Sequence, residues 1–150
     1  MPKQLTIGKL RGLQQISDEV GIFAMCAMDH RGSMQRMISG AEPDKVNAET
    51  LEAYKRDLTG FLAPASTAVL LDPIYGAAQA IASGALPGDT GLLVSLEETG
   101  YESDAQGRVT TLLPNWSVEK IKRMGASAVK ILLYYRPDLY RQASSCNSYA

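Results

Sequence analysis

Polar residues stand where three of the four apolar segments of this sequence end. They are Asp29, His30 and Arg31 after the first segment, Asp72 at the end of the second, and Glu97 and Glu98 at the end of the third. If these segments are parallel strands of one sheet, their ends lie along the same edge, where α/β proteins bind their ligands. An edge rich in carboxylates, with one histidine and one arginine, suits a small polar substrate.

A lysine lies inside the fourth apolar segment. By the alternation of a strand, Lys130 is on the same face as Ala128, Leu132 and Tyr134. An ammonium group buried there must be paired or have a lowered pKa, and a lysine with a lowered pKa can act as a nucleophile or a proton carrier. Asp29 is its natural partner. The alternatives are a structural ion pair inside a barrel and a lysine that extends to solvent from an edge strand.

The other polar residues have ordinary interpretations as well. Asp72 stands before a proline, which is more typical of a turn after a strand than of catalysis. His30 and Arg31 could clamp a phosphate or carboxylate, or could belong to a common type of loop. Glu97 and Glu98 are more typical of a solvated rim than of an acid/base pair. Because the chain has one histidine, a multi-histidine metal site is excluded, and we predict neither a metal nor a cofactor.

The four apolar segments have the length of strands. They are GIFAMCAMD at 21–29, TAVLLDP at 67–73, GLLVSLE at 91–97 and AVKILLYY at 128–135. Hydrophobicity that runs on without polar alternation is typical of parallel strands covered on both faces. The sequence therefore predicts a parallel sheet rather than antiparallel hairpins.

Helical patterns lie before and between these strands. We predict helices over 6–16, 47–62, 76–83 and 117–124. In the second of them the predicted buried face consists of Leu51, Tyr54, Leu58, Phe61 and Leu62. Asn47 and Ser117 are predicted N-caps, while Gly84 and Gly125 are predicted to end helices. The polar segment 101–114 is a predicted binding loop after the third strand. This order predicts an α/β fold of about four βα units preceded by a short helix.

Five segments taken together resemble a known family. They are GKLRGLQQIS near the start, FAMCAMDHRGSM, LLDPIYG, EETGY and GASAVKILLYYRPD. In this order, from about Lys9 to Asp138, they resemble the class I tagatose 1,6-bisphosphate aldolases and their close aldolase relatives. The resemblance implies a (β/α)₈ TIM barrel, of which this chain would be the N-terminal half. It also implies reversible cleavage of a ketose bisphosphate to dihydroxyacetone phosphate and glyceraldehyde 3-phosphate through a lysine Schiff base, without a metal.

The resemblance also assigns roles to residues. Asp29 looks like the family's active-site aspartate on the first strand. Lys130 looks like its second lysine, which lies beside the nucleophile and helps to set its pKa, whereas the residues alone would nominate Lys130 as the Schiff-base former. In the family, the nucleophilic lysine belongs to a later strand, beyond the end of this chain. His30 stands where the family usually has glutamine, and it is predicted with Arg31 to bind the substrate.

Length sets further expectations. A complete barrel typically needs about 250 residues, and this chain has 150. We therefore predict a partial aldolase domain over 1–138 and an atypical tail over 139–150 that arises from a truncated gene or a frame change. Such a chain is expected to be inactive alone. The alternatives are a noncatalytic half-barrel that binds a metabolite or a partner chain, and a related aldolase acting on a sulfonated sugar phosphate.

Composition excludes several classes of partner. With 15 Lys+Arg against 16 Asp+Glu, a basic nucleic-acid surface or a polybasic membrane surface is excluded. No segment approaches the roughly 20 apolar residues of a membrane helix. The two cysteines, Cys26 and Cys146, are too few for a disulfide framework, so we predict a cytoplasmic protein. A half-barrel leaves one sheet face bare and two strand edges unpaired, which predicts self-association, with a sugar phosphate as the small-molecule partner.

Overall fold

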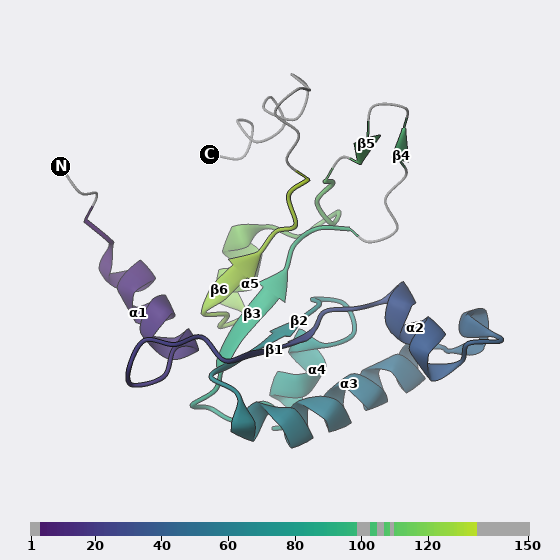
Figure 1. The fold of residues 1–150 in the computed structure, drawn as a ribbon, viewed down its shortest axis with the longest axis horizontal. Helices are drawn as coiled ribbons and strands as arrows, with labels where there is room; N and C mark the ends of the chain where they lie inside the picture. The colour runs from purple at the N-terminus through teal and green to yellow at the C-terminus, as the bar shows by residue number, and fades with distance from the viewer. Residues whose placement is uncertain (1–3, 99–102, 105–106, 109, 135–150) are drawn as a thin grey trace.

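Four short parallel strands form the main sheet of the computed structural model (Figure 1). The structure describes residues 4–98, 103–104, 107–108 and 110–134. The strands, in their order across the sheet, are β1 (Met25–Met28), β2 (Ala68–Leu71), β3 (Gly91–Ser95) and β6 (Ala128–Lys130). Each strand pairs with the next one along the chain, always in parallel. This is the arrangement of the first half of a (β/α)₈ barrel, which confirms the predicted α/β fold class.

One helix precedes these strands, and the others connect them. They are α1 (Ile7–Ile16), α2 (Gly32–Ile38), α3 (Ala48–Leu62), α4 (Ala77–Ala82) and α5 (Val118–Arg123), with short 3₁₀ turns η1 (Pro43–Lys45) and η2 (Ala63–Ala65). A two-stranded antiparallel hairpin, β4 (Ser103–Asp104) and β5 (Gly107–Arg108), lies between β3 and α5. Within the described residues, none of the helices has the length and apolar character needed to cross a bilayer.

Local sequence signals explain where the helices begin and end. The side chain of Asn47 accepts a hydrogen bond from the backbone N–H of Thr50 at 2.8 Å, and Ser117 accepts one from the N–H of Lys120 at 3.1 Å. Each bond satisfies an N–H group that the first helical turn leaves without a partner. After α5, Gly125 takes a φ of +102°, a value open to glycine without steric cost. These caps confirm the predicted helix boundaries.

The core lies between the sheet and the three helices α3, α4 and α5. It is built from strand residues of one parity together with inward-facing helix residues: Met28, Val69, Leu71, Leu92, Val94, Leu58, Leu62, Ala77, Ala80 and Ile121. Strand residues of the opposite parity are covered unevenly: Met25 and Ala27 are exposed and Leu70 and Leu93 are half-buried, whereas Ala68 and Ser95 are buried. The sheet therefore has one closely packed face and one partly open face.

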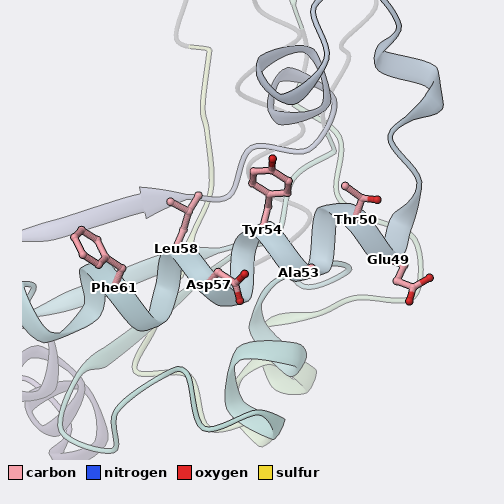
Figure 2. A pocket seen from close by; sticks show the side chains of 7 residues that line it. All are labelled: Glu49, Thr50, Ala53, Tyr54, Asp57, Leu58 and Phe61. Carbon is pink, nitrogen blue, oxygen red and sulfur yellow. The ribbon is translucent and has the colours of Figure 1, made fainter.

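Helix α3 is rotated relative to the prediction. Its fully buried residues are Leu51, Lys55 and Thr59, spaced four apart, whereas Tyr54 and Phe61 are 49% and 81% exposed. The prediction was therefore wrong for Tyr54 and Phe61, which instead flank an open pocket along α3 (Figure 2). The reason is that Lys55 turns toward oxygen acceptors at the strand ends, which an apolar periodicity does not reveal.

Other local predictions need correction. The first strand begins at Met25 rather than at residue 21. The residues after it form helix α2 from Gly32 onward, where a loop was the ordinary interpretation. The predicted loop over 101–114 contains the β4–β5 hairpin, although 101–102, 105–106 and 109 lie outside the described residues. The predicted tail, 139–150, with Cys146, also lies outside them.

Helix α1 lies across the beginning of β3 and β6 (Figure 1). The approach is close because glycine stands at the contact: a Cβ atom added to Gly12 would lie 2.6 Å from the carbonyl oxygen of Ser127, just before β6. A second glycine, Gly91 at the start of β3, is equally tight against the backbone of Gln15. Two glycines thus permit α1 to cover the N-terminal end of the sheet, opposite the edge where the polar residues lie.

Replacing Gly12 with alanine is expected to lower the free energy of unfolding, although alanine is the better helix former. The added methyl group forces α1 away from Ser127, at a cost of roughly 1–3 kcal/mol. Gly8, in the same helix, has nothing within 4 Å of its Cβ position, so Gly8→Ala should raise stability by up to about 1 kcal/mol. Urea unfolding followed by circular dichroism checks both variants. If both variants change the free energy of unfolding in the same direction, α1 does not pack against Ser127 through Gly12.

Candidate active site

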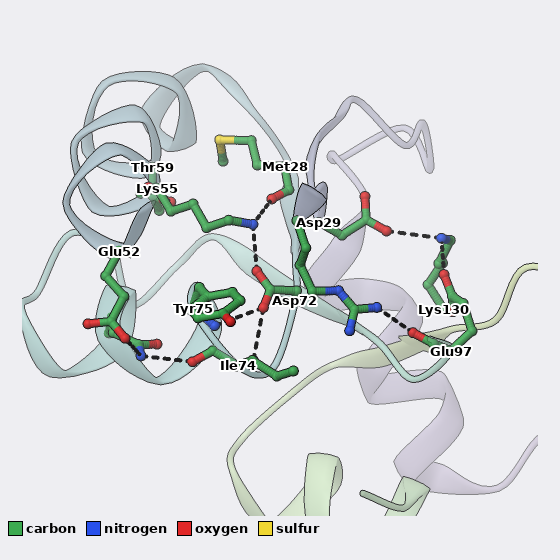
Figure 3. A network of polar contacts seen from close by, with 12 residues as sticks. Met28, Asp29, Glu52, Lys55, Thr59, Asp72, Ile74, Tyr75, Glu97 and Lys130 are labelled. Atoms are coloured by element: carbon green, nitrogen blue, oxygen red, sulfur yellow. Dashed lines mark hydrogen bonds and ion pairs between the residues drawn. The ribbon is translucent and has the colours of Figure 1, made fainter. Parts of the chain in front are cut away.

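Lys130 lies between two carboxylates at the C-terminal edge of the sheet. Its Nζ is 2.9 Å from Oδ2 of Asp29 and also donates a hydrogen bond to Oε1 of Glu97 (Figure 3). Asp29 directly follows β1, and Glu97 comes two residues after Ser95, the residue that pairs with Lys130 in the sheet register. All three side chains therefore point to the same, partly open face. The structure brings together Asp29 and Lys130 as the sequence predicted.

The two carboxylates decide the charge of Lys130. Burial acts to lower its pKa, but the hydrogen bonds to Glu97 and Asp29 and the negative charges of both outweigh burial, so the pKa is raised above its usual 10.5. Its side chain is 29% exposed, which leaves the amine open to a small molecule. Lys130 is thus an ammonium ion at neutral pH. Of the two possibilities for a lysine in this strand, the structure shows the paired one and not the lowered pKa.

Glu97 is a central member of this cluster, and its interpretation as a solvated rim residue was wrong. It is 2% exposed, and its second carboxylate oxygen is buried without a hydrogen-bond partner among the described residues. An isolated bridge to Leu112 holds its backbone in place after β3 has ended. The signal that could have found Glu97 is its parity, because it lies on the same face as Leu93 and Ser95.

Arg31 joins the cluster from the first strand end. It is 8% exposed, its Nη2 donates a hydrogen bond of 2.6 Å to the carbonyl oxygen of Glu97, and its Nε is buried without a partner in the described part of the chain. His30, next to Asp29, is exposed. Of the two residues predicted to bind the substrate, Arg31 therefore contacts the cluster, whereas His30 lies at its solvent side.

A second ion pair lies beside the first, under the ends of β1 and β2. Nζ of Lys55 is 2.5 Å from Oδ2 of Asp72 and 2.8 Å from the carbonyl oxygen of Met28, and both side chains of the pair are fully buried (Figure 3). The other carboxylate oxygen of Asp72 accepts hydrogen bonds from the backbone N–H groups of Ile74 and Tyr75, at 2.9 and 2.8 Å. Asp72 thus has the predicted turn role, and in addition it holds a lysine that the sequence analysis missed.

The electrostatics of Lys55 link the two pairs. Burial lowers its pKa, the charge and hydrogen bond of Asp72 and the charge of Asp29 oppose that effect, and Arg31 lowers the pKa further. Lys55 is too deeply buried to meet a substrate, so its contacts are with the protein alone. The side chains that a substrate can reach are therefore Asp29, Lys130 and the residues around them.

No group of three or more metal-ligating side chains with the geometry of a metal site occurs among the described residues. The site consists of the Lys130 ammonium group, which Asp29 and Glu97 flank on the partly open sheet face. Arg31 contacts the backbone of Glu97. Such a group can bind an anionic or polyhydroxylated molecule and can stabilise charge as it develops.

Known proteins are similar to this chain over most of its length. A family profile described as "DeoC/LacD family aldolase" matches residues 23–148. The chain is 38% identical over 134 residues to tagatose 1,6-diphosphate aldolase 2 of Enterococcus faecalis, covering 89% of this chain and 39% of that protein. It is 41% identical over 135 residues to a tagatose 1,6-diphosphate aldolase of Listeria monocytogenes, covering 90% of this chain and 39% of that protein.

A tagatose 1,6-diphosphate aldolase of Staphylococcus haemolyticus is 38% identical over 130 residues, again with 39% of that protein covered. The chain thus spans about two-fifths of the length of these relatives. The family profile nevertheless covers most of this sequence, including both strand ends that supply Asp29 and Lys130. This chain belongs to the DeoC/LacD family of aldolases.

Proposed function

We propose that this chain supplies the first half of the active site of a Schiff-base aldolase that cleaves a ketose bisphosphate of the tagatose 1,6-bisphosphate type. The observation that carries the proposal is the Lys130 ammonium held between Asp29 and Glu97 on the open face of a parallel sheet. The names of the relatives support the substrate class, because they are tagatose 1,6-diphosphate aldolases.

The proposed reaction separates the roles of two lysines. A neutral lysine amine adds to the substrate ketone and, with uptake of one proton and loss of water, forms an iminium ion, and the final hydrolysis returns that proton. The bond between the third and fourth carbons then breaks, its electrons move to the iminium nitrogen, and the proton of the hydroxyl on the fourth carbon passes to a base. The aldehyde leaves as glyceraldehyde 3-phosphate. Protonation of the enamine, followed by hydrolysis, releases dihydroxyacetone phosphate and the free amine.

Lys130 is not that nucleophile, because an ammonium ion has no lone pair to donate. Its fixed positive charge instead favours the neutral form of a neighbouring lysine and stabilises negative charge on substrate oxygens. Asp29 and Glu97 hold the ammonium group in position. Arg31 donates a hydrogen bond to the carbonyl oxygen of Glu97 and so holds the backbone of that residue. The nucleophile is then a second lysine, which the resemblance to the family assigns to a later strand.

A chimeric enzyme tests the function. Residues 9–134 of this chain replace the matching segment of the Listeria monocytogenes relative, and cleavage of tagatose 1,6-bisphosphate is measured by coupled oxidation of NADH. We expect turnover by the chimera. A correctly folded chimera that binds no sugar bisphosphate and shows no turnover would overturn the proposal.

Trapping with borohydride assigns the nucleophile. The 150-residue chain and the chimera are incubated with dihydroxyacetone phosphate and sodium borohydride, and the modified lysine is found by peptide mass spectrometry. We expect an adduct in the chimera outside the transplanted segment, and no adduct at Lys130 in either protein. An adduct at Lys130 would show that this lysine is itself the Schiff-base former.

We also propose that the 150-residue chain self-associates. Among the described residues, β1 and β6 each have a neighbour on one side only, so β6 of one copy can continue the parallel sheet of a second copy through its β1. Met25 and Ala27 on β1 are exposed, and Phe61 on the adjoining helix α3 is 81% exposed. A second copy that covers this surface removes apolar area from water.

We therefore expect light scattering after size-exclusion chromatography to give a mass of at least twice 16.2 kDa. Phe61→Ser should shift the distribution toward monomer, whereas Ile81→Ser should not. Ile81 is also an exposed apolar side chain, but it is on α4, the helix between the two inner strands. A monomer that melts cooperatively would contradict the proposal.

A further inference from the structure

The buried Lys55 has contacts that lead directly to the active-site aspartate. Its Nζ donates to the carbonyl oxygen of Met28 at 2.8 Å, and Met28 is the residue immediately before Asp29 in the chain. A peptide unit is planar, so the carbonyl of Met28 and the N–H of Asp29 share one plane. A hydrogen bond that holds this carbonyl therefore fixes the plane in which the Cα of Asp29 lies, and so restricts the directions in which the Asp29 side chain can point.

Asp72 in turn holds Lys55 in one position. Its Oδ1 is fixed by the two N–H groups of the turn after β2, which leaves Oδ2 directed at Nζ of Lys55 at 2.5 Å. Gly76 allows the next helix to begin here, because a Cβ atom at that position would lie 3.2 Å from both the carboxylate and the carbonyl of Asp72. The ammonium group of Lys55 is thus held at one place, where it reaches Asp72 and the Met28 carbonyl together.

The geometry connects this pair with the catalytic cluster in three steps. The turn after β2 orients Asp72, Asp72 orients Lys55, and Lys55 orients the peptide unit that carries Asp29. Asp29 then accepts from Lys130, 101 residues away in the chain. The charges of Asp29 and Arg31 both act on Lys55, so the two pairs are also coupled through space.

We propose that Lys55 is a positioning residue that directs the Asp29 carboxylate toward Lys130. This inference deepens the proposed function and rests on it for its catalytic meaning, although the positioning itself is a property of the folded chain. Lys55 does not contact the substrate in this scheme, and Asp72 serves as its anchor.

The test uses the double variant Lys55→Met/Asp72→Asn. It removes both buried charges at once, so neither charge is left unpaired, and asparagine keeps the Oδ1 acceptor of the turn. The readout is the rate at which acetic anhydride modifies Lys130 in the 150-residue chain as pH is varied, followed by peptide mass spectrometry. The groups that face Lys130 are Asp29 and Glu97, with Arg31 behind Glu97.

If Lys55 positions Asp29, the double variant weakens the Asp29–Lys130 pair, and the labelling rate at a fixed pH below 10 rises by up to about tenfold, equivalent to one pKa unit. Asp29→Asn gives the largest rise that this mechanism allows, and adding the double variant to it should give no further rise. Thr59→Val is the control, since Thr59 is equally buried on α3 and its hydroxyl touches only the helix backbone, at the carbonyl of Lys55.

A labelling rate that stays at the wild-type value in the folded double variant would overturn the inference, because Lys55 would then serve stability alone. Circular dichroism shows whether each variant is folded, and Asp72→Asn alone, which removes the charge that anchors Lys55, should change the labelling rate in the same direction as the double variant. The result is independent of turnover. A correctly folded chimera that neither binds a sugar bisphosphate nor shows turnover would refute the proposed function and leave the labelling result intact. An active chimera together with unchanged labelling would refute the positioning role only.

Discussion

Replacement of Lys130 by methionine in the chimeric aldolase is expected to lower kcat/KM by about a hundredfold to a thousandfold, the range seen when a preorganised group that stabilises transition-state charge is removed. Methionine has a similar length and no charge. It therefore removes the ammonium from between Asp29 and Glu97 and leaves two carboxylates facing each other on the open sheet face. Cleavage of tagatose 1,6-bisphosphate, measured over a range of substrate concentrations, separates the effect on kcat from that on KM.

The controls separate charge from shape. Lys130→Arg keeps the positive charge but replaces a compact ammonium group by a planar guanidinium group, so we expect an activity between those of the wild type and Lys130→Met. Lys9→Met removes an exposed lysine on α1 and should leave turnover unchanged. Activity of Lys130→Met within threefold of wild type would remove Lys130 from the reaction.

Asp72→Asn in the 150-residue chain is expected to lower the free energy of unfolding by about 3–5 kcal/mol, because it leaves the fully buried Lys55 without its counter-charge. A loss of this size is a large part of the total stability of a typical domain. Urea unfolding at pH 7 measures it. Lys55→Met/Asp72→Asn should recover most of the loss, since no unpaired charge remains.

The pH dependence of this variant has a definite sign. The folded-state pKa of Lys55 is already lowered by burial, and removal of the Asp72 charge lowers it further. Between this lowered value and the ordinary 10.5, the unfolded chain binds more protons than the folded chain, so stability rises with pH. Asp72→Asn should therefore be least stable near neutral pH and regain stability toward pH 10. Stability that is flat over this range would show that Lys55 keeps its proton in the folded chain as it does in the unfolded chain, so that its pKa is not lowered.

Much of the fold could be predicted from local patterns. The caps at Asn47 and Ser117 and the left-handed glycine at Gly125 depend on residues within one helical turn, and the structure has them as predicted. The pairing of Asp29 with Lys130 could be predicted too, because both stand at the ends of strands that share an edge. The same parity argument applied to Glu97 would have placed it in the cluster.

The rotation of α3 could not be predicted from local patterns. The apolar pattern of α3 is compatible with two rotations of the helix, and it favoured the one that buries Tyr54 and Phe61. The observed rotation buries Lys55 instead, and its acceptors lie 17 and 27 residues away in the chain. A lysine among apolar residues gives no local sign of which distant oxygen atoms will surround it.

Patterns along the chain were enough to predict the strands, their parallel order, the helix ends and the edge at which the polar residues gather. The pairing of Lys130 with two carboxylates, the burial of Glu97 and the burial of Lys55 beside Asp72 became evident only in the folded chain. The physical reason is that the free energy of a buried charge depends on partners brought within about 3 Å by the fold. For Lys130 these partners are 33 and 101 residues distant.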